Sequence, residues 1–61
     1  MSVREEAIAN LRDEQTKLNA QGKTQYTLQL EADNAGLPLS QRYDAGRTLR
    51  YIAGLKQIIE G

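Results

Sequence analysis

The chain contains no cysteine, histidine, tryptophan or phenylalanine, and these absences exclude several kinds of site. Without cysteine there is no disulfide framework and no thiol nucleophile, and without cysteine or histidine no zinc finger can form. Catalytic triads that require an imidazole are excluded as well. We therefore expect a protein that is not an enzyme and that has no cofactor and no metal site.

A charge excess of one sign and a long hydrophobic run are also missing. Eight basic residues balance eight acidic residues, so the formal net charge is zero. A neutral chain has no basic excess to neutralise phosphates, so we do not expect nucleic-acid binding. No run of about 18 apolar residues is present, which argues against a membrane partner. The first six residues are mostly polar and lead into no apolar core, so we expect no secretion signal.

The length of 61 residues sets the scale of the fold. It allows one small domain, which we place at residues 1–61. A chain of this size buries only about 60% of the surface that it exposes when unfolded. Small domains compensate with disulfides, metals or partners, and the first two are excluded here. The size therefore favours a homo-oligomer.

The first segment, at about residues 2–21, is predicted to be a helix. Ser2 and Glu5 have the spacing of a capping box, in which the serine oxygen accepts from the backbone N–H three residues later. Gly22 suits the left-handed position just after a helix. These two signals set the expected ends of the helix.

The last segment, at about residues 40–60, is predicted to be a longer helix, with Ser40 as its N-cap. At 100° per residue its apolar side chains cover an arc of roughly 220°. The arc consists of Ala45, Leu49, Tyr51, Ile52, Ala53, Leu55, Ile58 and Ile59. It is wider than one short helix and one hairpin can cover.

Between the two helices the hydrophobic period changes. At about residues 24–31 the apolar side chains Tyr26, Leu28 and Leu30 fall on every second position, which predicts a β-strand. Residues 32–39 contain Asp, Asn, Gly and Pro and predict a turn with a short extended second strand. The sequence as a whole therefore predicts an α+β fold, mostly helical, with the order helix, short strand or hairpin, helix.

The wide apolar arc suggests that copies of the chain meet. The alternative is a monomer that uses the whole arc for its own core. We expect part of the arc, with the strand, to face another subunit. The predicted interface residues are Tyr51, Ile52, Leu55, Ile58, Ile59, Tyr26 and Leu28.

A basic face lies opposite the arc. Tyr43, Arg47 and Arg50 lie close together on the helical wheel, together with Gly46 and Gly54. Glycine lets another backbone or a ligand approach closely, and arginine offers a planar fork of donors for phosphate or carboxylate. Three interpretations are open for this face: a solvated surface, a charged subunit contact, and a site for an anionic or nucleotide ligand.

Three local motifs resemble the small head-completion proteins of lambda-like phages, which join the head to the tail. The motifs are Arg4-Glu5-Glu6 at the start of the first helix, Gly22-Lys23 at its end, and Tyr51-Ile52-Ala53-x-Leu55 in the last helix. The second strand of the family's hairpin is fuller than residues 36–39 here. The resemblance implies a helix–hairpin–helix fold and a ring of copies between portal and tail. It also implies other virion or host proteins as partners, and a location in the host cytoplasm or the virion.

Two further functions compete with this interpretation. One is a small phage or bacterial inhibitor that holds an anionic or nucleotide ligand between subunits through Tyr43, Arg47 and Arg50. The other is a ribbon-type dimeric DNA-binding protein, which would read bases with alternate strand residues, here Gln25, Thr27 and Gln29. We favour a non-enzymatic, self-assembling protein of the phage structural type.

Overall fold

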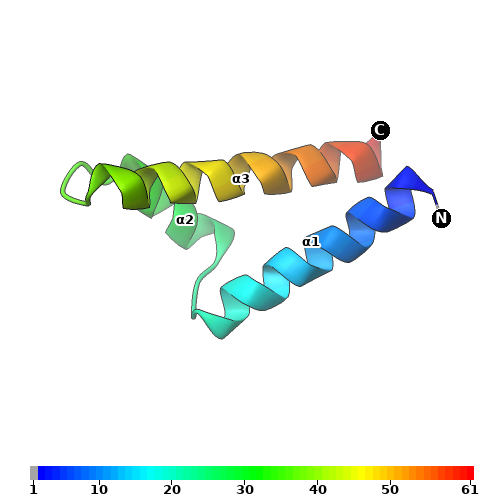
Figure 1. Cartoon of the computed structure of the whole chain (residues 1–61), viewed down its shortest axis with the longest axis horizontal. Coiled ribbons are helices and arrows are strands. Elements are labelled where there is room, and N and C mark those ends of the chain that lie inside the picture. Colours follow the sequence, from blue (N-terminus) through cyan, green and yellow to red (C-terminus); the bar gives the residue numbers. More distant parts are fainter. Residues whose placement is uncertain (1) are drawn as a thin grey trace.

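The computed structural model of the chain describes residues 2–61, so Met1 of the predicted domain lies outside them. Three helices account for most of these residues (Figure 1): α1 at Val3–Ala20, α2 at Gln25–Asp33 and α3 at Leu39–Glu60. No strand is present within residues 2–61. The fold is all-helical, and the predicted α+β class is wrong.

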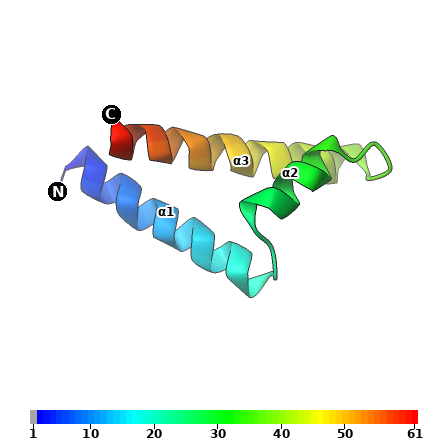
Figure 2. The same cartoon turned by 180° about the vertical axis from the view of Figure 1, so that it is seen from behind.

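Helix α3 is the element against which both other helices pack. Helix α1 and α3 meet at the end of the molecule where both termini lie, and they diverge toward the other end, where α2 lies against α3 (Figures 1 and 2). The principal extents of 42 × 22 × 16 Å describe a flat, elongated shape. Such a shape has a large surface for its volume, so little of the chain is covered.

The ends of α1 follow the local signals in the sequence. Ser2 Oγ accepts a hydrogen bond from the Glu5 backbone N–H at 3.2 Å, which confirms that half of the capping box. Gly22 has a φ of 69°. The Lys23 N–H donates to the Leu18 carbonyl at 2.8 Å, and the Gly22 N–H donates to Asn19 at 3.0 Å. This pair of bonds is a Schellman motif, which uses glycine because the left-handed conformation carries no Cβ penalty there.

The segment predicted as a strand at residues 24–31 is the helix α2. Thr24 is its N-cap, and its hydroxyl accepts from the Thr27 N–H at 3.2 Å. In this helix only Leu28 is buried, while Tyr26 and Leu30 are 71% and 54% exposed. The alternation of apolar residues therefore does not mark two faces of a sheet. It arises because one buried leucine lies between two outward-facing apolar residues.

The turn is shorter than the predicted residues 32–39, because its two ends belong to helices. Asn34 is its first residue, and the Asn34 side-chain Oδ1 accepts from the Gly36 N–H at 2.9 Å. Helix α3 then begins at Leu39, with Pro38 as the flanking residue and no side-chain cap. Ser40, the predicted N-cap, lies inside the helix, so that assignment is wrong. No hairpin forms from these residues.

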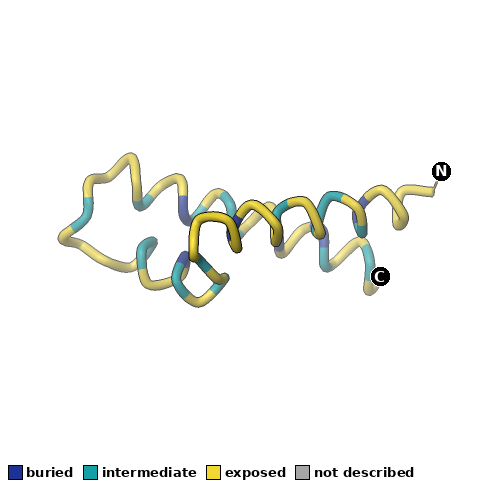
Figure 3. The backbone as a smooth tube through the Cα atoms, turned by 90° about the horizontal axis from the view of Figure 1, so that it is seen from below, coloured by how far each residue is buried: buried dark blue, intermediate teal, exposed yellow. Residues whose placement is uncertain are grey.

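The core is small and gathers where the three helices meet. Leu18 of α1, Leu28 of α2, and Ala45 and Ile52 of α3 form one buried cluster. Leu11, Ala32 and Leu49 pack against it. Figure 3 shows how few positions along the backbone are buried. None of the side chains in residues 2–61 is less than 2% exposed.

Two polar contacts hold α2 in place beside this core. Lys56 Nζ on α3 donates to Gln25 Oε1 at the start of α2, at 3.1 Å. Lys23 in the preceding loop pairs with Glu31 of α2, at 3.1 Å between Nζ and Oε1. Both lysines are partly buried, so these contacts fix the orientation of α2 as well as its position.

Candidate interaction surface

Among residues 2–61, seven large hydrophobic side chains remain exposed, and they are the first sign of an interaction surface. Four of them lie on α3, the longest helix. Of these four, Tyr51 and Ile58 are both 46% exposed and, being seven residues apart, lie on one side of the helix. The complete set is Val3, Tyr26, Leu30, Leu39, Tyr43, Tyr51 and Ile58.

The predicted interface residues divide into two groups. Leu28, Ile52 and Leu55 are buried inside the single chain, with 4%, 2% and 6% of their surface exposed. They have almost no surface left for a partner and serve the core. Tyr26, Tyr51 and Ile58 are exposed, and Ile59 is half-buried. The structure therefore separates a core side from a free side within the predicted apolar arc.

Tyr43, Arg47 and Arg50, the predicted basic face, are all exposed on α3. The Arg50 guanidinium carbon lies 6.0 Å from the centre of the Tyr43 ring, which is a cation–π distance. Within residues 2–61 neither Arg47 nor Arg50 forms an ion pair. The structure thus leaves both arginines without an ion pair and places Arg50 near an aromatic ring.

The basic and apolar groups belong to one continuous surface. At 100° per residue, Tyr51 and Ile58 lie within about 40° of Arg47, and Arg47 lies within about 60° of Arg50. We call this surface the outer face of α3. It consists of Leu39, Tyr43, Arg47, Arg50, Tyr51 and Ile58.

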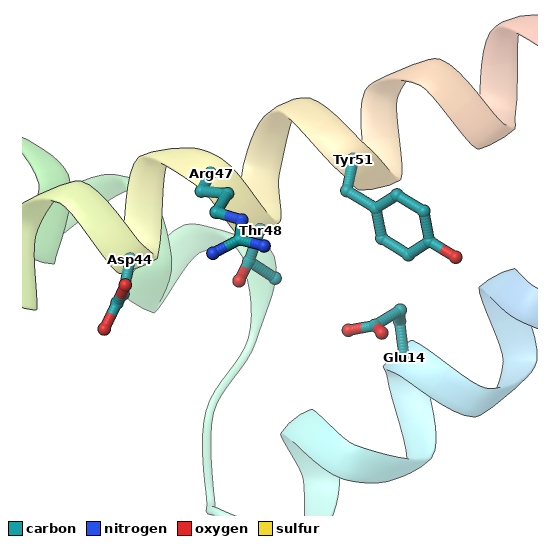
Figure 4. Close-up of a pocket in the computed structure, with 5 residues that line it drawn as sticks. All are labelled: Glu14, Asp44, Arg47, Thr48 and Tyr51. Carbon is teal, nitrogen blue, oxygen red and sulfur yellow. The ribbon is translucent and has the colours of Figure 1, made fainter.

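A cavity of about 440 Å³ borders this face, between α3 and α1. Figure 4 shows Asp44, Arg47, Thr48 and Tyr51 along one side of α3, with Glu14 of α1 across from Tyr51. The carboxylates of Glu14 and Asp44 share the cavity with the guanidinium of Arg47. An anionic ligand bound there would face both carboxylates, so this cavity does not favour the anion-binding interpretation.

A second cavity, of about 320 Å³, lies between the three helices and is lined by groups of both signs. Lys17 pairs with Glu14 at 3.5 Å, and Lys23 pairs with Glu31 at 3.1 Å. The charges that line this cavity therefore largely neutralise each other. It offers no unpaired cluster for a charged ligand.

Sequence reasoning missed two exposed apolar residues. Leu39, which belongs to the outer face of α3, falls in the predicted turn, and Leu30, which lies on α2 outside that face, falls in the predicted strand. Glu14 of α1, which lines the cavity beside this face, was not among the predicted site residues. Gln25, Thr27 and Gln29 lie on a helix. The strand pair that a ribbon-type DNA-binding dimer needs is therefore absent from residues 2–61.

Comparisons with known proteins add no relative: no family model, curated protein or solved structure matches this chain. Among residues 2–61 no helix is both long and apolar enough to cross a membrane. The same residues contain no group of three or more Asp or Glu side chains placed to hold a metal ion. The outer face of α3 is the candidate site that combines exposed apolar side chains with arginines that form no ion pair.

Proposed function

We propose that this chain is a non-enzymatic, self-assembling protein that acts through protein–protein contacts, of the phage structural and assembly type. The outer face of α3 is its main contact element. The observation that carries the proposal is that Tyr51 and Ile58 remain half-exposed beside the two unpaired arginines, Arg47 and Arg50. Aromatic residues and arginine are the residue types that dominate the energetics of protein interfaces.

The modest core supports the same proposal. Six hydrophobic residues are buried within residues 2–61, and two of them are alanines. For 61 residues, typical stabilities amount to about 3–9 kcal/mol in total. Burying a large apolar side chain completely contributes about 1.5–3 kcal/mol. Covering the exposed halves of Tyr51 and Ile58 would therefore add appreciably to the stability of a chain this small.

The phage assignment within this proposal depends on the three local motifs. Residues 4–6 open α1, Gly22-Lys23 forms its Schellman end, and residues 51–55 lie in the middle of α3. The hairpin implied by the resemblance is replaced by the helix α2. Genomic context tests this part: flanking portal and tail genes would support it, and flanking early or defence genes would contradict it.

Self-assembly is tested by measuring molar mass by sedimentation equilibrium over a range of protein concentrations. We expect a mass above that of the monomer that rises with concentration. The double variant Tyr51→Ser/Ile58→Ser should associate more weakly, because it removes apolar surface that the single chain leaves exposed. Leu30→Ser is the matched control, since Leu30 is 54% exposed but lies on α2.

Two results would contradict the proposal. One is a wild-type chain that stays strictly monomeric at high micromolar concentration. The other is a double variant that associates as strongly as the wild type while its circular dichroism spectrum is unchanged. Either would mean that the exposed apolar groups of α3 do not serve contacts between copies.

A further inference from the structure

The net charge of zero conceals an uneven distribution between the helices. Helix α3 carries four basic residues against two acidic ones, Asp44 and Glu60. Helix α1 carries four acidic residues against three basic ones. The positive excess therefore lies on α3, whereas α1 is close to neutral and α2 carries two acidic residues and no basic one. Surfaces of opposite charge orient association, so the unpaired charges on each helix decide which surfaces can recognise each other.

The outer face of α3 supplies the positive partner. Arg47 and Arg50 are exposed, and within residues 2–61 no carboxylate pairs with either of them. The Arg50 guanidinium carbon lies 6.0 Å from the centre of the Tyr43 ring, at the outer limit of a cation–π contact. Arginine offers a planar fork of donors that matches the geometry of a carboxylate, so both arginines suit docking against acidic side chains.

Helix α1 supplies a matching negative surface. Glu6 and Asp13 are exposed and seven residues apart, so they share one side of the helix, which we call the acidic face of α1. This side is turned by at least about 100° from the buried Ala7 and Leu18. Within residues 2–61 neither carboxylate forms an ion pair. Lys17 is the nearest cation by helical angle, but it is paired with Glu14.

The two faces do not pair with each other within the folded molecule. Helices α1 and α3 pack against each other, but within residues 2–61 no ion pair joins Glu6 or Asp13 to an arginine of α3. A single chain therefore leaves both charged faces unpartnered. A second copy of the same chain carries the complement of each.

We propose that copies of this chain dock head to tail, with the acidic face of α1 of one copy against the outer face of α3 of the next. Glu6 and Asp13 pair with Arg47 and Arg50, and Tyr51 and Ile58 provide the adjoining apolar contact. This inference rests on the proposed function and adds which surfaces meet. In this head-to-tail arrangement a single contact between α1 and α3 joins two copies, so each copy keeps one free face and the contact repeats into a ring or an open chain.

Charge reversal tests the pairing. Arg47→Glu/Arg50→Glu and Glu6→Lys/Asp13→Lys each place like charges opposite one another. We expect each to raise the dissociation constant by more than about tenfold. The chain that combines all four substitutions again has opposite charges at the contact and the same net charge as the wild type. Sedimentation equilibrium should therefore show its association restored.

A control variant separates pairing from net charge. Arg4→Glu/Arg12→Glu changes the net charge as much as Arg47→Glu/Arg50→Glu, but both substitutions lie on exposed positions of α1 outside the acidic face. It should associate within a few-fold of the wild type. Circular dichroism of every variant establishes that a loss of mass is not a loss of folding.

The possible results separate the two proposals. The head-to-tail pairing is overturned, while self-assembly stands, if the wild type associates but the quadruple variant stays monomeric although every variant is folded. The pairing is likewise overturned if the wild type associates and the charge reversals have no effect, which would assign the charged faces to a different partner. If the wild type is itself monomeric at high concentration, both proposals fail.

Discussion

Ile52 and Ile58 offer a direct test of which side of α3 belongs to the core. Both were predicted to lie at a subunit interface, and they lie six residues apart on one helix. Ile52 is 2% exposed and packs with Leu18 and Leu28, whereas Ile58 is 46% exposed. Replacing each by alanine removes the same atoms from two different environments.

The expected magnitudes differ clearly. Ile52→Ala removes buried methyl groups and leaves a cavity, which costs about 2–5 kcal/mol. Ile58→Ala removes atoms that are already half in water, so it should cost at most about 1 kcal/mol. Alanine is the better helix former at both positions, and that gain cancels in the comparison. Against a total stability of about 3–9 kcal/mol, Ile52→Ala should leave a marginally folded chain.

Urea unfolding followed by circular dichroism measures this difference, at low protein concentration so that association does not contribute. We expect a much lower midpoint for Ile52→Ala and a small shift for Ile58→Ala, both with the wild-type slope. Equal shifts would refute the assignment of Ile52 to the core and Ile58 to the free side. A large shift for Ile58→Ala alone would reverse it.

Three further outcomes are expected in thermal unfolding. Gly22→Ala should destabilise the chain by about 1 kcal/mol because the φ of Gly22 is positive. Gly46→Ala should stabilise it by about 0.5–1 kcal/mol because the added Cβ meets open space in a helix. Stability changes of the same sign in the two variants would contradict the Schellman assignment. Thr24→Ala should cost about 1 kcal/mol through the lost N-cap of α2, and no loss would question that helix. Lys23→Met should lower the stability by at most about 1 kcal/mol, and by less in high salt, because the pair of Lys23 with Glu31 is only partly buried. A loss that does not change with salt would show that the lysine stem matters more than its charge.

The ends of α1 were readable from the sequence because they depend on local chemistry. Ser2 caps through the N–H three residues later, and Gly22 takes the left-handed conformation that glycine accepts most easily. Neither requires a distant part of the chain. The long amphipathic pattern of α3 is local in the same sense, and it predicted a helix over nearly the observed residues.

The sequence reasoning failed at α2 because the eight residues 24–31 carry too little periodicity to separate a strand from a helix. Tyr26, Leu28 and Leu30 alternate, yet Leu28 alone is buried. The local signal that points to a helix here is Thr24, whose hydroxyl accepts from the Thr27 N–H as an N-cap. In the folded chain α2 presents one side to α3, so a single leucine is enough to anchor it.

Three properties follow from the order and kind of the amino acids alone: the capped helix at the N-terminal side, the long amphipathic helix at the C-terminal side, and a chain without groups for thiol or imidazole chemistry. Which part of the wide apolar arc of α3 is free depends instead on how the helices pack. Packing by α1 and α2 buries Ile52 and Leu55, and it leaves Tyr51 and Ile58 exposed beside the arginines. Helical periodicity states which side chains share a side, but which side is covered depends on where the other helices lie.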